Sequence, residues 1–176
     1  MKKLLLVVMM MGASMAFAQT DAISKFFNKY QSDESFSQVT VSSKMFSLFT
    51  NMEVESKEDQ EILNAISKLK GLRILAKENA RDGYQLYKEA MGLIPTREYE
   101  ELMSVRDKDK DMKFFIKETS PGKISELLMV AGGSEEFMVL SLFGEIDLKQ
   151  VGKIGSKMDI DGLDHLDRID DKNKKN

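Results

Sequence analysis

The sequence of 176 residues contains no cysteine, no tryptophan, two prolines and a single histidine. Without cysteine the chain cannot form disulfides, thiolate nucleophiles, cysteine-ligated zinc sites or iron–sulfur clusters, and it has no cysteine to lipidate. A single histidine excludes an intramolecular metal site built from several imidazoles. Hydrophobic residues make up 42% and charged residues 31%, an ordinary globular balance. The length predicts one domain.

The first 18 residues have the layout of a secretory signal peptide. Lys2 and Lys3 precede an apolar run over residues 4–11, and the segment ends in Ala16, Phe17 and Ala18. A positive start, a short apolar centre and a small-x-small exit are typical of a cleaved leader. An N-terminal membrane anchor is the alternative, but the apolar run is shorter than the roughly 20 residues that span a bilayer. We therefore expect cleavage after Ala18.

Loss of the leader would remove two lysines and no acidic residue, which changes the formal net charge from −3 to −5. This mild acidity argues against nucleic-acid binding, which normally requires a basic face. No later stretch of the sequence is long and apolar enough to span a membrane. These features predict a soluble exported protein, periplasmic or secreted, with neither a lipid anchor nor a transmembrane span.

The first half of the chain after the leader is predicted to alternate helices with strands. Apolar residues that recur every three or four positions indicate amphipathic helices, and alternation indicates strands. The helices are expected over residues 23–30, 45–49, 56–70 and 87–94, and the strands over 36–42 and 72–77. Ser56 is expected to cap the third helix, Gly71 to stop it, and Pro95 to end the fourth.

After Pro95 the sequence predicts four consecutive strands and a last helix. The strands are expected over residues 99–105, 112–118, 124–131 and 137–143, and the helix from Leu148. Because their separators are short and rich in turn residues, neighbouring strands should pair antiparallel as a meander. We predict an α+β fold: a single domain over 19–158, with a mixed, mostly antiparallel sheet of about five to six strands and helices packed on one face. Residues 159–176 form a predicted Asp- and Lys-rich tail.

The order of several short motifs resembles that of a known family. The motifs are Val41-Ser-Ser-Lys-Met-Phe-Ser-Leu-Phe49, Leu69-Lys-Gly-Leu-Arg-Ile-Leu75, Tyr99-Glu-Glu-Leu-Met103, and Ile124-Ser-Glu-Leu127 followed by Leu142-Phe-Gly-Glu-Ile-Asp-Leu148. Over roughly residues 21–158 the chain resembles the exported bacterial family catalogued as domain of unknown function 4252. The resemblance implies export, a small α+β domain and an envelope role, with a hint of envelope-stress regulation.

The resemblance brings no activity, cofactor or catalytic residue with it. Many proteins of this kind resemble lipoproteins, and this chain departs from them because it has no cysteine to lipidate.

The most site-like acidic pattern is Asp107-x-Asp109-x-Asp111, with Glu118 eleven positions after the first aspartate. These spacings match ligand positions of an EF-hand calcium loop. Met112, however, stands where that loop needs glycine for its sharp turn, and the residues that follow it are predicted as a strand. We therefore expect a solvated hairpin tip here.

The tail contains a second acidic group and the only histidine. Several aspartates between Asp159 and Asp170 surround Gly162, an arrangement that could hold calcium weakly. A short amphipathic helix, with leucine or isoleucine at every third position, explains the same pattern. His165 lies among these carboxylates, which favour its charged form. No serine stands in a Gly-x-Ser-x-Gly elbow, so His165 is expected to be a solvated tail residue.

The remaining candidates have plain structural interpretations. They are the acid pairs Glu100–Glu101 and Glu135–Glu136, the loop Gly132-Gly133-Ser134, and the aromatic residues Tyr84, Tyr87, Phe114 and Phe115. Adjacent acids on a strand point to opposite faces, so each pair is expected at the surface. The glycine loop is expected to be a strand turn, since no phosphate-binding Lys-Ser/Thr follows it. The aromatic residues could line an apolar pocket or pack in the core.

The sequence thus predicts no catalytic residue, no metal site and no cofactor. The favoured function is that of a non-enzymatic exported protein that contacts an unknown protein partner in the cell envelope. A carrier of a small apolar ligand is the first alternative, and a carboxylate-based hydrolase is the second. An exposed apolar patch would favour a protein partner, and an enclosed apolar cavity would favour a carrier.

Overall fold

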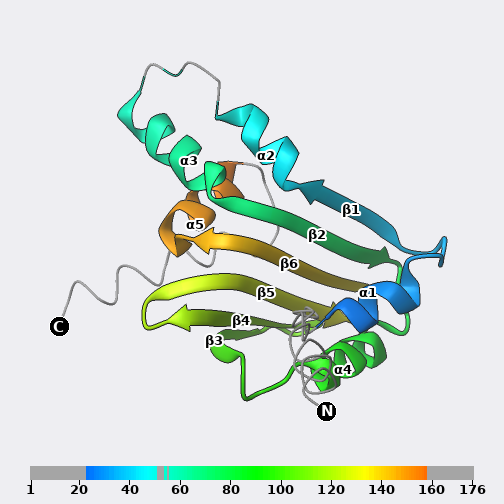
Figure 1. Ribbon diagram of the computed structural model, residues 1–176. Coiled ribbons are helices and arrows are strands. Elements are labelled where there is room, and N and C mark those ends of the chain that lie inside the picture. The colour runs from blue at the N-terminus through cyan, green and yellow to red at the C-terminus, as the bar shows by residue number, and fades with distance from the viewer. Residues whose placement is uncertain (1–22, 51–53, 55, 158–176) are drawn as a thin grey trace, which may run out of the picture.

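The computed structural model describes residues 23–50, 54 and 56–157. The predicted leader over 1–18 and the predicted tail over 159–176, which includes His165, lie outside the described residues. In the described part, five helices pack against one six-stranded sheet (Figure 1). None of these helices has the length and apolar character needed to cross a bilayer. The α+β class and the size of the sheet agree with the prediction.

The elements follow the predicted order with shifted boundaries. They are α1 Ser24–Tyr30, β1 Ser37–Ser42, α2 Ser43–Phe49, α3 Lys57–Ser67, β2 Leu69–Glu78, α4 Gly83–Leu93, β3 Glu100–Arg106, β4 Lys110–Ser120, β5 Lys123–Gly133, β6 Glu136–Ile146 and α5 Leu148–Lys157. The Ser56 hydroxyl accepts a hydrogen bond from the Asp59 backbone N–H at 3.0 Å, so the predicted cap is confirmed. Helix α4 ends at Leu93, one residue before the predicted end at Ile94, so the predicted stop before Pro95 is confirmed to within one residue.

The predicted stop at Gly71 is wrong. Helix α3 ends at Ser67, and Gly71 lies inside β2, where it pairs with Phe143 of β6. The helical periodicity of the sequence continues past Ser67, but these residues belong to strand β2. Pairing with β6 and burial of Leu69 stabilise the strand more than another helical turn would.

The sheet has the order β1-β2-β6-β5-β4-β3. Strands β3 to β6 form the predicted meander. The short β1–β2 unit joins the meander because β2 pairs with β6 along almost its whole length. All five strand pairings in the described residues are antiparallel, where the sequence had predicted a mixed, mostly antiparallel sheet. The edges of the sheet are therefore β1 and β3.

The helices pack on both faces of the sheet, where the sequence had predicted one. Helices α1 and α4 cover a core cluster that includes Phe26, Leu86 and Phe137. Helices α2, α3 and α5 contribute to a second cluster, on the opposite face, that includes Phe46, Val151 and several side chains of β4 to β6. The reason is visible in β5, whose residues 127–131 are apolar and buried on both faces. In Figure 1, α1 and α4 lie toward one end of the strands and the other three toward the opposite end.

Gly144 allows β6 to pass the start of β2. It has a φ of +136°, and a Cβ atom at this position would lie 2.5 Å from the Lys68 carbonyl oxygen and 2.7 Å from Leu69 Cα. The next residue, Glu145, donates its backbone N–H to the same Lys68 oxygen at 3.2 Å. Only glycine fits this backbone and this spacing.

Candidate functional site

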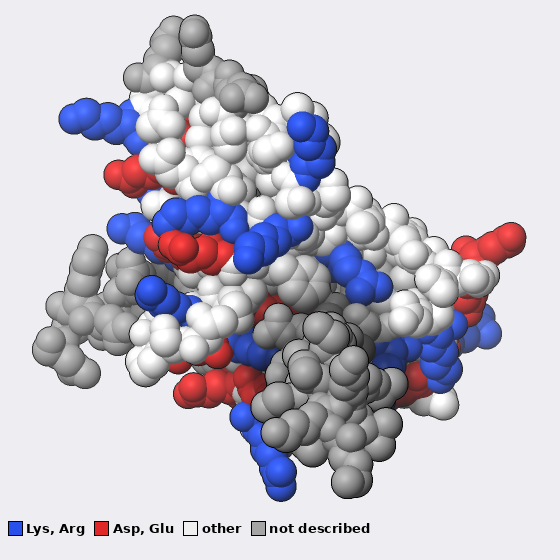
Figure 2. All heavy atoms as spheres, in the orientation of Figure 1, with Lys and Arg blue, Asp and Glu red and all other residues white. Residues whose placement is uncertain are grey.

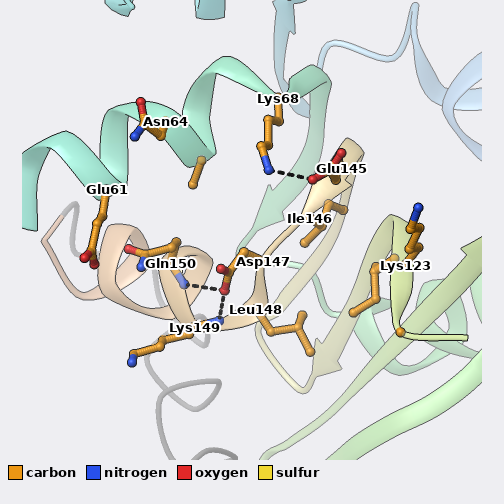
Figure 3. Close-up of a pocket in the computed structure, with 13 residues that line it drawn as sticks. Glu61, Asn64, Lys68, Lys123, Glu145, Ile146, Asp147, Leu148, Lys149 and Gln150 are labelled. Atoms are coloured by element: carbon orange, nitrogen blue, oxygen red, sulfur yellow. Dashed lines mark hydrogen bonds and ion pairs between the residues drawn. The ribbon is translucent and has the colours of Figure 1, made fainter.

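A polar groove with a volume of about 730 Å³ lies between α3, the β4–β5 turn and the junction of β6 with α5 (Figure 3). Its lining includes three carboxylates, Glu61, Glu145 and Asp147, and an ammonium group, Lys68. Converging carboxylates in a groove are the arrangement that a hydrolase would need. The contacts of these carboxylates therefore decide what the groove can do.

Two of the three carboxylates in the groove have structural partners. Glu145 Oε1 lies 2.6 Å from Lys68 Nζ, and this hydrogen bond and charge lower the pKa of Glu145 and raise that of Lys68. Asp147 accepts hydrogen bonds from the backbone N–H groups of Lys149 and Gln150, so it caps helix α5. Both carboxylates are therefore engaged by partners of the fold, Glu145 in an exposed ion pair and Asp147 in a helix cap.

A second hollow of about 490 Å³ lies at the opposite end of the sheet, beside the β5–β6 turn. Its lining includes Glu78, Asp109, Lys110 and Glu136. Lys110 and Glu136 form an ion pair at 2.6 Å. Like the first groove, this hollow is open and polar, so neither resembles the enclosed apolar cavity that a carrier requires.

A carboxylate is buried between the sheet and the segment that precedes β3. Glu126 of β5 is 5% exposed and accepts hydrogen bonds from the hydroxyls of Tyr99, at 2.5 Å, and Ser141, at 2.8 Å. Donors of this kind compensate for the loss of water around a carboxylate. All three side chains are buried, so this cluster ties Tyr99 to β5 and β6 and does not present a reactive group to a substrate.

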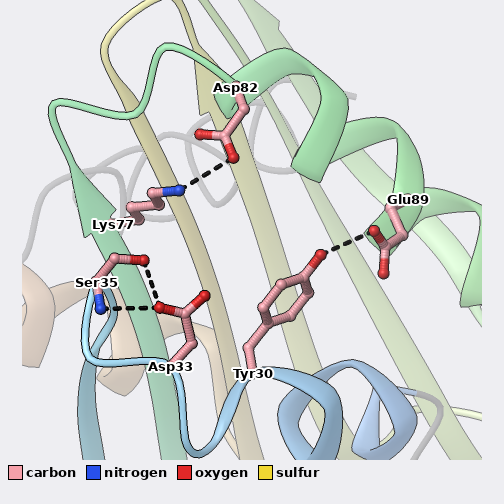
Figure 4. A network of polar contacts seen from close by, with 6 residues as sticks. All are labelled: Tyr30, Asp33, Ser35, Lys77, Asp82 and Glu89. Atoms are coloured by element: carbon pink, nitrogen blue, oxygen red, sulfur yellow. Dashed lines mark hydrogen bonds and ion pairs between the residues drawn. The ribbon is translucent and has the colours of Figure 1, made fainter.

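The junction between α1 and β1 is held by short polar contacts (Figure 4). Asp33 accepts hydrogen bonds from the backbone N–H and the hydroxyl of Ser35, and these bonds lower the pKa of Asp33. Tyr30 donates to Glu89 of α4 at 2.9 Å. Burial raises the pKa of Tyr30, and the bond to Glu89 raises it further. The chain therefore enters β1 from a well-anchored turn.

The acidic residues singled out from the sequence lie at separate places. Asp107 and Asp109 lie in the turn between β3 and β4, whereas Glu118 lies near the far end of β4, where it accepts from the Gly122 backbone N–H. The structure does not bring these groups together. Glu101 pairs with Lys113 at 2.7 Å, and Glu136 pairs with Lys110, so one member of each adjacent acid pair forms a surface ion pair.

The glycine loop and the aromatic residues serve packing. Gly132, the next-to-last residue of β5, lies against α4, and a Cβ atom there would lie 2.5 Å from Tyr87 Cβ. Phe114 and Phe115 point to opposite faces of β4, into the second and the first core cluster respectively. They cannot line one pocket, and core packing is the interpretation that the structure supports. Tyr84 is 38% exposed on α4.

Three of the four exposed large apolar residues in the described part of the chain belong to β1 and the helix that follows it. Val39 is 47% exposed, Met45 is 47% exposed and Leu48 is 56% exposed. We call these three residues, with the strand β1, the β1–α2 surface. Figure 2 shows few charged atoms over this part of the molecule, in contrast to the mixed charges elsewhere on the same face. A cluster of exposed apolar side chains on a protein surface is typical of an interaction site.

Sequence reasoning missed both the buried carboxylate and this surface. One signal for Glu126 was available, namely an acidic residue directly before the apolar run that begins at Leu127 and Leu128. No local signal separates Val39 from the buried valines, because its exposure results from the edge position of β1 in the assembled sheet.

The protein belongs by its architecture to the α+β class, with one antiparallel sheet whose faces are both covered by helices. A family model described as domain of unknown function (DUF4252) matches residues 30–154. The chain belongs to this family, as the motif order had indicated. No curated protein and no solved structure matches the chain.

Proposed function

We propose that this member of the family is an exported, non-enzymatic protein that acts in the cell envelope through protein–protein contacts at the β1–α2 surface. The observation that carries the proposal is that Val39, Met45 and Leu48, each about half exposed, lie on the edge strand β1 and on the helix α2 that directly follows it. Burial of such side chains against a partner gains roughly 25 cal/mol per Å² of apolar surface. The regulatory role that the family resemblance implies would operate through this contact.

The alternative functions have less support. A carrier of a small apolar ligand needs an enclosed apolar cavity, and the two hollows described above are open and lined by charged side chains. A carboxylate hydrolase needs two free acids across a cleft, and in the larger groove Glu145 and Asp147 are held by Lys68 and by the start of α5.

The contact is tested with a photoactivatable amino acid at Leu48 in the full chain, expressed in the cells that naturally produce it. We expect a cross-linked protein adduct, because 56% of the Leu48 side chain is available to a partner. The matched control carries the same group at Tyr84, an exposed apolar position on α4. Met45→Glu should weaken the Leu48 adduct and leave the background at Tyr84 unchanged. Equal adducts at both positions would contradict the proposal.

Export is tested separately by mass spectrometry of the protein outside the cytoplasm. We expect its first residue to be Gln19, in accordance with the tripartite leader. Intact Met1 on the exported protein, or recovery that requires detergent, would contradict this part of the proposal.

A further inference from the structure

Strand β1 is an open sheet edge without charged residues. It pairs with β2 on one side, and in the part of the chain that the structure describes no strand pairs with its other side. Its sequence, Ser37 to Ser42, contains hydroxyl, amide and valine side chains, with neither lysine nor proline. An edge strand of this kind exposes backbone N–H and C=O groups that can pair with another strand.

The other edge carries the features that usually prevent such pairing. Strand β3 contains Glu100, Glu101 and Arg106, and its register with β4 shifts between Glu101 and Met103. Charged side chains and bulges are the common means by which proteins protect a sheet edge. The difference between the edges indicates that β1, and not β3, is available for a partner strand.

The charges at the two ends of β1 favour one particular partner. Asp33 and Glu34 precede the strand, and Lys44 follows it. All three are exposed, and the hydrogen bonds from Ser35 hold the Asp33 carboxylate in place. If two copies of β1 run antiparallel, the acidic end of each lies beside the basic end of the other. A parallel arrangement would bring like charges together, which costs free energy.

We propose that the β1–α2 surface binds a second copy of this chain, through antiparallel β1–β1 pairing about a two-fold axis at Val39. The inference rests on the proposed function, since it names the partner of that surface. In this register Val39 of one copy faces Val39 of the other, and Glu34 lies at the same end as Lys44 of the other copy. Such an isologous contact is the commonest form of homodimer, and it would continue the sheet across both copies.

Val39 also places an apolar contact at the axis. Its side chain points to the same face of the sheet as Ile74, its partner on β2, and as Val41. Two valines facing each other across a strand pair are a favourable β-branched contact. Since 47% of the Val39 side chain is exposed in one copy, this contact would bury surface that the isolated chain leaves in water.

The absence of cysteine makes the register directly testable. In the full chain, purified after its normal processing, Val39→Cys should form an intermolecular disulfide on mild oxidation, since facing Cβ atoms in such a pair lie close to disulfide distance. Thr40→Cys, one residue along and also exposed, is the matched control. We expect the disulfide dimer to form at least about tenfold faster for Val39→Cys. Equal rates for Val39→Cys and Thr40→Cys would overturn the proposal.

Charge reversal at the ends of β1 provides a second test that leaves Val39 unchanged. Glu34→Lys should raise the dissociation constant of the dimer by about fivefold, because two attractive pairs become repulsive. The double variant Glu34→Lys with Lys44→Glu should restore the constant to within about twofold. Sedimentation equilibrium measures both. A protein that stays monomeric at all concentrations, or a double variant no better than the single one, would overturn self-pairing.

The two proposals fail in different ways. If the purified protein is monomeric but Leu48 still yields an adduct whose mass differs from that of two copies, self-pairing is wrong and the proposed function stands. If Leu48 yields no adduct and the purified protein is monomeric, both are wrong.

Discussion

The two edges of the sheet differ in charge, in regularity and in what lies beside them. Strand β1 has no charged residue and continues into α2, where Met45 and Leu48 are exposed. Strand β3 has three charged residues and a register shift, and Glu101 forms an ion pair with Lys113 of β4. One chain thus protects one sheet edge and leaves the other bare. Since an unprotected edge risks aggregation, its presence beside exposed apolar side chains supports the partner contact proposed above.

The edges also differ in how they are attached to the rest of the molecule. Among the described strands, β1 pairs with β2 alone, and the pairing of β2 with β6 begins at the close contact of Gly144 with Lys68 and Leu69. Edge β3 is part of the meander, and the buried hydrogen bond from Tyr99 to Glu126 lies directly before it. The following predictions test this difference.

The largest effect is expected at the attachment of β1. Gly144→Ala places a Cβ atom against backbone at a φ of +136°, so we expect a loss of about 3 kcal/mol in the free energy of unfolding. Chemical denaturation followed by circular dichroism measures it. Gly92→Ala in α4 is the control, because an added Cβ there meets nothing within 4 Å and should stabilise the helix slightly. Equal free energies of unfolding for the two variants would show that the backbone at Gly144 does not require glycine.

A smaller effect is expected at the attachment of β3. Tyr99→Phe keeps the ring and removes the hydroxyl that donates to buried Glu126, which should cost about 1–3 kcal/mol. Tyr84→Phe removes an exposed hydroxyl and should change stability by less than about 0.5 kcal/mol. Thermal and chemical unfolding of both variants provide the comparison. A Tyr99→Phe variant as stable as the parent would show that the hydroxyl is not needed.

The edges themselves can be compared with one substitution. Val105 of β3 is partly buried in the second core cluster, so Val105→Lys should cost about 1–2 kcal/mol of stability. Val39 is 47% exposed, so Val39→Lys should cost the monomer less than about 0.5 kcal/mol. The same Val39→Lys variant should abolish self-association. If instead Val39→Lys lowers the stability of the monomer as much as Val105→Lys does, β1 is no more tolerant of a charged residue than β3, and the contrast between the edges is wrong.

The smallest effect concerns pH and the ion pair Lys68–Glu145. Because the pKa of Glu145 is lowered in the folded state, the pair stabilises the fold above the ordinary carboxyl pKa of 4.5, and this contribution is lost as pH falls through the lowered value. Glu145→Gln should therefore lower the urea midpoint slightly at neutral pH and leave it unchanged under strongly acidic conditions. Both groups are exposed, so high salt should also remove the difference. A difference that grows on acidification would contradict the role assigned to the pair.

Local patterns predicted most of the elements and little of their assembly. The meander after Pro95, the Ser56 cap and the amphipathic helices follow from periodicity and turn residues within short windows. The predicted end of α3 is wrong because the pairing of Leu69 in β2 with Gly144 in β6, which is distant in the chain, decides where the helix stops. The distribution of helices over both faces was missed for the same reason.

The candidate surface was less predictable than the fold. The amino-acid composition excludes thiol chemistry and sites with several imidazoles, because the chain has no cysteine and one histidine. The order of the motifs was enough to indicate the family. The burial of Glu126 against two hydroxyls and the edge position of β1 emerge from the assembled fold. Burial and edge position depend on long-range pairing, and no short stretch of sequence contains that information.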